Sequence, residues 1–89
     1  MDKHQVSAIV WSEIKRCANP ELARSVVEAD AQMPLDLLGI DSTALIHLFL
    51  ALEEKLHINL EDLAIGRPAT IGDVIEIGEA AVRKASGLR

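Results

Sequence analysis

The sequence LLGIDSTAL at residues 37–45 runs an apolar segment through a glycine and into the start of a helix. Asp41 is well suited to the N-cap position, because its carboxylate can accept hydrogen bonds from the first backbone N–H groups of the following helix. Ser42 then falls on the first helical turn, where we expect its hydroxyl to face outward. Since Asp and Ser begin many helices, this feature alone does not define a functional site.

The helix predicted over residues 42–56 has two apolar rows. One row has the spacing of a core-facing stripe, and its members are Leu45, Leu48, Phe49, Leu52 and Leu56. The second row lies beside it, with Ser42, Ile46 and Leu50 at positions i, i+4 and i+8. Glu53 and Glu54 continue this row and are expected on a solvated face. This second row is either an extension of the core stripe on a buried helix or a strip for docking partners beside a modified serine.

Residues 38–42, LGIDS, resemble the hallmark of acyl carrier proteins and peptidyl carrier proteins, an apolar-Gly-apolar-Asp-Ser run that opens the second helix. The resemblance continues in residues 51–56, ALEEKL, in Ile58, and in residues 68–71 before the last helix. It covers residues 34–82 well. The resemblance implies an all-α fold, a four-helix bundle with three longer helices, one short third helix and a long loop between helices 1 and 2.

The resemblance also implies a chemistry. Ser42 would carry a covalent 4′-phosphopantetheine arm, transferred from coenzyme A. Asp41 would cap the helix and help the phosphopantetheinyl transferase to recognise the carrier. The positive end of a helix dipole suits the anionic phosphodiester. The arm would hold an acyl, aminoacyl or peptidyl group as a thioester. The protein would then be a carrier that serves enzymes and is not an enzyme itself.

Further implied partners are an acyl- or aminoacyl-loading ligase or acyltransferase, and downstream synthase or modifying enzymes. The contact residues expected for such partners are Thr43, Ile46, Leu50, Glu53 and Glu54. Acidic residues would steer the encounter and the apolar pair would fix the register of docking. The net charge of −5 favours basic partner surfaces and argues against nucleic acid.

The sequence departs from the family pattern after the serine. Thr43 stands where most members have a bulky apolar residue, and Ala44 and His47 stand where fatty-acid carriers often have acids. These departures favour a discrete carrier in specialised biosynthesis, of polyketide or nonribosomal peptide type, or in aminoacyl transfer. The alternatives are a housekeeping fatty-acid carrier and, from another class, a helical protein-interaction module without a prosthetic group. The interaction module explains the bundle and the apolar strip but not the Gly-Ile-Asp-Ser run.

Length and composition predict one domain over residues 1–89, with its core at about 3–84 and a frayed tail at 85–89. Hydrophobic residues make up 49% of the chain and aromatic residues 2%, so the core must be aliphatic. The only cysteine, Cys17, cannot form an internal disulfide and fits a cytoplasmic location. We expect a monomer without a membrane span, and the start of the sequence lacks the layout of a signal peptide.

Before the serine, helical spacing of apolar residues predicts a first helix over residues 3–17, with Trp11 at the edge of the core and with Glu13, Lys15 and Arg16 on a solvated face. Residues 20–32 form either a short helix that reaches Val27 or an ordered loop. Three leucines of the next segment are expected to enter the bundle, and they are Leu35, Leu37 and Leu38.

After residue 56, Asn59 can cap a short helix over residues 60–65. Thr70 and Asp73 have the spacing of a capping box for the last helix. The buried face of that helix is predicted to comprise Ile71, Val74, Ile75, Gly78, Ala81 and Val82. Gly78 weakens the helix by roughly 1 kcal/mol relative to alanine, and close packing against a neighbouring helix would explain its presence.

The sequence gives no catalytic or metal-binding set. Asp41, Ser42 and His47 include the residue types of a catalytic triad, but His47 lies five residues after Ser42 and about 140° around the helix, so it cannot bond that hydroxyl. His4, His47 and His57 lack the spacing of metal ligands. We therefore expect neither catalytic residues nor a metal site.

Overall fold

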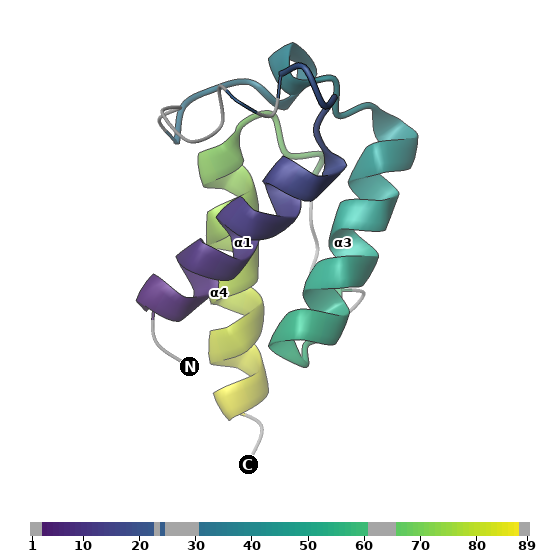
Figure 1. Cartoon of the computed structure of the whole chain (residues 1–89). Helices are drawn as coiled ribbons and strands as arrows, with labels where there is room; N and C mark the ends of the chain where they lie inside the picture. Colours follow the sequence, from purple (N-terminus) through teal and green to yellow (C-terminus); the bar gives the residue numbers. More distant parts are fainter. Residues whose placement is uncertain (1–2, 23, 25–30, 61–65, 88–89) are drawn as a thin grey trace.

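The computed structural model describes residues 3–22, 24, 31–60 and 66–87. Within them it contains three α-helices, α1 (Lys3–Cys17), α3 (Ser42–Leu56) and α4 (Ile71–Gly87), and a short 3₁₀-helix, η1 (Leu35–Leu38), as Figure 1 shows. The described residues form no strand, only an isolated antiparallel bridge between Pro34 and Thr70. The all-α prediction is confirmed. Residues 61–65 of the predicted short third helix lie outside the described residues, as do four of the eight residues of the possible helix at 20–27.

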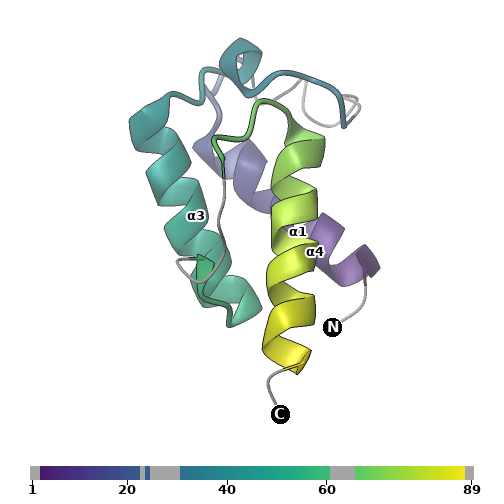
Figure 2. The same ribbon diagram turned by 180° about the vertical axis from the view of Figure 1, so that it is seen from behind.

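Helix α1 packs against both α3 and α4, and these two helices touch each other less. The first turn of α3 and η1 lie at one end of the bundle, away from the start of α1 and the end of α4 (Figures 1 and 2). The largest fully buried side chains are all aliphatic, as the composition predicted: Val6, Val10, Ile14, Leu38, Leu48, Leu52, Ile71 and Val74. Trp11 and Phe49 are partly buried at the edge of this core.

The turn before α3 depends on Gly39. Its φ is 74°, in the left-handed region that favours glycine, and its N–H donates to the carbonyl oxygen of Asp36 (3.1 Å). A Cβ at this position would lie 3.1 Å from the Cβ of Asn19. The N–H of Asn19 also donates to the carbonyl oxygen of Leu38 (2.9 Å), which ties the end of α1 to this turn. Gly39 therefore meets both a conformational and a steric requirement.

The expectation that three leucines enter the bundle is wrong for one of them. Leu35 and Leu38 are buried, but the side chain of Leu37 is 63% exposed. A 3₁₀-helix has three residues per turn, so residues i and i+3 share a face and the residue between them turns away. The 3₁₀ geometry of η1 thus places Leu35 and Leu38 inside and Leu37 in solvent.

The capping box predicted at the start of α4 is confirmed. The N–H of Asp73 donates to Oγ1 of Thr70 (3.1 Å), and Oδ2 of Asp73 accepts from the N–H groups of Thr70 (3.1 Å) and Ala69 (2.9 Å). The adjoining backbone pairs with the chain before η1, since Leu35 N–H donates to the carbonyl oxygen of Ala69 (2.9 Å). These bonds hold the start of α4 beside η1. The helix continues to Gly87, and the expected fraying from residue 85 stays a prediction.

Close packing at Gly78 is also confirmed. A Cβ there would lie 3.2 Å from Val6 Cγ1, 3.5 Å from Leu56 Cδ1 and 3.7 Å from Val10 Cγ2. Side chains of α1 and α3 therefore meet α4 at this position.

Glu13 corrects the prediction of a solvated face on α1. Its exposed fraction is only 4%, and its Oε2 accepts a hydrogen bond from Nε of Arg16 at 2.7 Å. The Arg16 side chain remains 64% exposed. Glu13 and Arg16 line a hollow between α1 and α3 together with Glu54 and Lys55 of α3. The polar residue lies inside because α3 covers this side of α1, which helical spacing alone could not reveal.

Candidate functional site

Asp41 caps α3 as the sequence predicted. Its backbone is extended (φ −85°, ψ −171°), and its Oδ1 accepts a hydrogen bond from the N–H of Ala44 at 2.9 Å. The carbonyl oxygen of Asp41 accepts from the N–H of Leu45 at 2.8 Å, the first bond of the helix ladder. Together these bonds fix the direction in which the chain enters the helix.

Ser42 is the first residue of α3 and is exposed to solvent, as is Thr43. A helix of this length has partial positive charge at its N-terminus, where backbone N–H groups point outward. An anionic group attached at Ser42 would therefore lie in a favourable field. The exposed position also leaves the serine accessible to a modifying protein.

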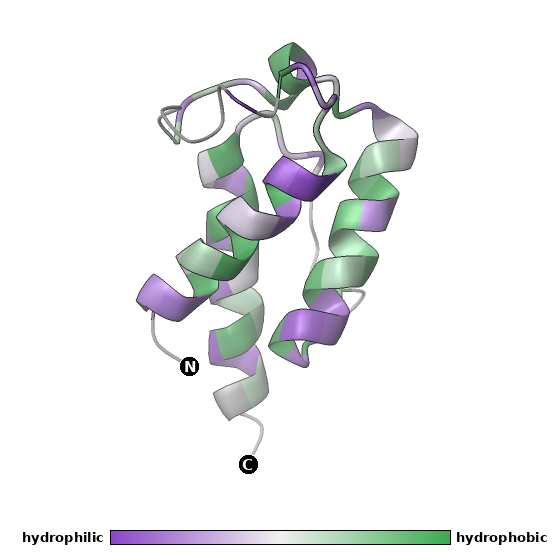
Figure 3. Ribbon diagram, in the orientation of Figure 1, coloured by the Kyte–Doolittle hydropathy of each residue, from purple (hydrophilic) through white to green (hydrophobic). Residues whose placement is uncertain are grey.

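The second row of α3 faces solvent. Ile46 is 59% exposed and Leu50 is 58% exposed, so the interpretation of this row as an extension of the core is wrong. In the predicted core row, Leu45, Leu48, Leu52 and Leu56 are buried and Phe49 is partly buried. Figure 3 shows that α3 is hydrophobic over most of its length and becomes hydrophilic in its last turn. We call Ile46 and Leu50 the α3 strip.

The two acids beyond the α3 strip differ in their surroundings. Glu54 is exposed, as expected of a solvated face. Glu53 is only partly exposed, and its Oε2 accepts a hydrogen bond from the N–H of Leu60 at 2.9 Å. The expectation that Glu53 lies on a freely solvated face is therefore corrected: its carboxylate holds the chain that follows α3. No local sequence pattern predicts this bond, because the two partners are seven residues apart and a turn lies between them.

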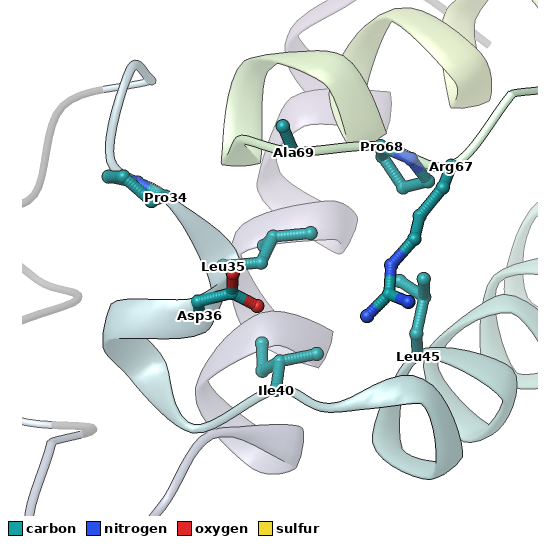
Figure 4. A pocket seen from close by; sticks show the side chains of 8 residues that line it. All are labelled: Pro34, Leu35, Asp36, Ile40, Leu45, Arg67, Pro68 and Ala69. Carbon is teal, nitrogen blue, oxygen red and sulfur yellow. The ribbon is translucent and has the colours of Figure 1, made fainter.

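A cavity of about 240 Å³ lies between η1, the start of α3 and the segment before α4 (Figure 4). Its lining residues come from these three segments and are Pro34, Leu35, Asp36, Ile40, Leu45, Arg67, Pro68 and Ala69. No motif in the sequence predicts this cavity. No local pattern could have done so, since the segments meet only in the folded chain.

Among the other reactive side chains, the Cys17 thiol is free and partly buried. Burial raises the pKa of the Cys17 thiol, which favours the protonated and less nucleophilic form. Among the described residues, no three His, Cys, Asp or Glu side chains are grouped so as to hold a metal ion. None of the described helices combines the length and apolar character needed to cross a membrane.

A comparison with protein-family models matches residues 12–77 to the family described as "Phosphopantetheine attachment site". The match spans most of the chain and includes Asp41, Ser42 and all of α3. Searches of the curated proteins and of the solved structures gave no match.

Proposed function

The chain belongs to the phosphopantetheine-attachment family, whose members are carriers rather than enzymes and hold 4′-phosphopantetheine covalently, and we propose that Ser42 is its attachment residue. The observation that carries this proposal is the exposed position of Ser42 at the start of α3, directly after the Asp41 cap. The residues fit the group, since a phosphodiester is anionic and the helix N-terminus favours an anion.

The chain's own part in the function is to anchor and present a substrate. When bound, the arm supplies a thiol that holds an acyl, aminoacyl or peptidyl group as a thioester. Asp41 fixes the entry of the chain into α3 and forms part of the surface that the transferase recognises. Tethering gives the substrate a high effective concentration at each partner enzyme.

Partners dock on the side of α3 that carries the α3 strip. The exposure of Ile46 and Leu50 supports this, because exposed apolar residues with charged neighbours are typical of interaction sites. Thr43 and Glu54 are exposed beside them, while Glu53 is only partly exposed and lies at the edge of this surface. The partners are the transferase, an acyl- or aminoacyl-loading ligase or acyltransferase, and downstream synthase or modifying enzymes. The negative net charge favours basic surfaces on them.

The pathway we propose is specialised biosynthesis of polyketide or nonribosomal peptide type, served by a discrete, monomeric, cytoplasmic carrier. Ala44 and the exposed His47 support this choice over a housekeeping fatty-acid carrier, because they make the start of α3 less acidic than in fatty-acid carriers. The specialised assignment would be contradicted if this protein bound the host's fatty-acid synthase enzymes as tightly as the host's housekeeping carrier does.

Intact mass spectrometry tests the attachment site. The purified protein is incubated with coenzyme A and a broad-specificity phosphopantetheinyl transferase, and we expect a gain of one arm. Ser42→Ala should abolish the gain while circular dichroism remains that of a folded helical protein. Ser12→Ala, which changes an exposed serine on α1, should leave the gain intact.

The same assay tests the docking surface. Ile46→Ala combined with Leu50→Ala should slow modification of Ser42 without changing the helical content. A mass gain that survives Ser42→Ala would overturn the assignment of Ser42 as the attachment site. The absence of a mass gain in the protein without substitutions would favour an interaction module without a prosthetic group.

A further inference from the structure

We propose that the cavity beside the start of α3 binds a short acyl group, held on the arm at Ser42, whose far part carries an uncharged hydrogen-bonding group such as a hydroxyl. This inference rests on the proposed function and adds the class of the cargo. Ile40 and Leu45 line the cavity and stand on either side of Asp41 and Ser42 in the chain. The cavity is therefore next to the turn that bears the attachment residue.

The size of the cavity limits the cargo. A volume of about 240 Å³ is below the range of roughly 300–1,000 Å³ typical of sites for drug-sized ligands. A short acyl group fits this space, and a long saturated chain does not.

The lining combines an apolar floor with a charged mouth. Leu35, Ile40 and Leu45 are buried core residues that form apolar walls. Asp36 and Arg67 are both exposed, and their side chains reach the cavity from different segments, Asp36 from η1 and Arg67 from the chain before α4 (Figure 4). The structure gives neither side chain an ion pair or hydrogen bond with another described residue. Both are available to a ligand.

The two opposite charges select against charged cargo. A carboxylate on the acyl group would be attracted by Arg67 and repelled by Asp36. An ammonium group would be attracted by Asp36 and repelled by Arg67. A hydroxyl can donate to the Asp36 carboxylate and accept from the Arg67 guanidinium at the same time. A purely apolar group would offer no hydrogen bond to either charge. The lining thus favours an acyl group with an apolar stem and a hydroxyl.

The test compares cargos that differ by one hydroxyl. The transferase loads the protein with 3-hydroxybutyryl or with butyryl from the corresponding acyl-coenzyme A, and mass spectrometry verifies each loading. Methyl NMR spectra of Leu35, Ile40 and Leu45 then report on the cavity. We expect 3-hydroxybutyryl to shift these methyl signals more than butyryl does, relative to the protein that carries the arm without an acyl group.

Thioester reactivity gives a second readout. Each loaded protein is treated with hydroxylamine, and its rate is divided by the rate of the same acyl group on free coenzyme A, which removes intrinsic reactivity. We expect the hydroxylated cargo to be protected about fivefold more than butyryl, the equivalent in an equilibrium constant of one net hydrogen bond. Arg67→Met and Asp36→Asn should each remove this difference, whereas Arg83→Met, an exposed charge on α4 outside the cavity, should leave it.

Three results would overturn the inference. The first is equal protection and equal methyl shifts for the two cargos. The second is a difference that survives both cavity variants. The third is stronger protection of a malonyl or a lauroyl group, which would assign the cavity to an anionic or a long cargo. In all three cases the mass gain at Ser42 remains, so the proposed function stands. A missing mass gain would refute the proposed function and this inference together.

Discussion

At the scale of single residues, Glu13 is a carboxylate enclosed between α1 and α3. Its only hydrogen-bond partner among the described residues is Arg16, three positions later on the same helix. The side chain of Arg16 is largely exposed to solvent. The Glu13 carboxylate raises the pKa of the Arg16 guanidinium, through their hydrogen bond and through charge attraction. A buried carboxylate that loses its partner keeps the full penalty of desolvation. Removal of Arg16 and removal of Glu13 should therefore change the stability of the protein by different amounts.

Replacement of Arg16 is predicted to destabilise the protein more than replacement of Glu13. Arg16→Leu should lower the free energy of unfolding, because it leaves the Glu13 carboxylate buried and unpaired. Glu13→Leu should be close to neutral, since it removes the buried charge and leaves an arginine that water can solvate. Urea denaturation measures both. Lys15→Leu, an exposed neighbour, controls for loss of one positive charge, and an equal effect from Lys15→Leu and Arg16→Leu would contradict the prediction.

At the scale of elements, both α3 and α4 begin at a side-chain cap, and the cap of α4 makes stability depend on pH. The N–H groups of Ala69 and Thr70 donate to the Asp73 carboxylate and hold its pKa below its ordinary value of 3.8. A group whose pKa is lower in the folded protein stabilises the fold above its unfolded pKa. That stabilisation is lost as the pH falls through the folded pKa. Helix α4 should therefore be held most firmly at neutral pH and less firmly in acid.

The pH dependence can be measured on the cap of α4. Asp73→Asn should be less stable than the unmodified protein at pH 7, and the difference should shrink as the pH falls below 3.8. Thr70→Ala removes the uncharged half of the box and should cost about 1 kcal/mol with a much weaker dependence on pH. Thermal unfolding from pH 7 to pH 2 provides both curves. A constant gap between Asp73→Asn and the unmodified protein over this range would rule out the Asp73 carboxylate as the source.

At the scale of the whole molecule, the three helices come together at Gly78. Val6 and Val10 approach it from α1, and Leu56 approaches it from α3. Alanine would favour the helical state of α4 itself by about 1 kcal/mol. An added methyl group in a packed interior costs about 1–3 kcal/mol. The packing between helices should therefore outweigh the preference of the single helix.

Gly78→Ala is thus predicted to lower the free energy of unfolding by up to about 2 kcal/mol, the difference between these two effects. The closest contact of the new Cβ would be Val6 Cγ1 at 3.2 Å. Val6→Ala removes that methyl group, so Gly78→Ala should be less harmful, or even stabilising, in the Val6→Ala background. A double-mutant cycle by urea denaturation should give a coupling of about 1 kcal/mol. Additive effects of the two substitutions would show that the contact at Val6 is not the cause.

Features that depend on neighbours along the chain are predictable from the amino-acid sequence. The bounds of α1 and α3, the cap at Asp41, the capping box of Thr70 and Asp73 and the position of Ser42 all follow from contacts within one helical turn, and each was predicted. Tertiary structure alone decided which sides of each helix are covered. It buried Glu13, left Leu37, Ile46 and Leu50 in solvent, and brought Asp36 and Arg67 to the lining of the same cavity. Helical periodicity states which residues share a face, but the width of the buried stripe depends on the neighbouring helix, whose position is set by packing over the whole chain.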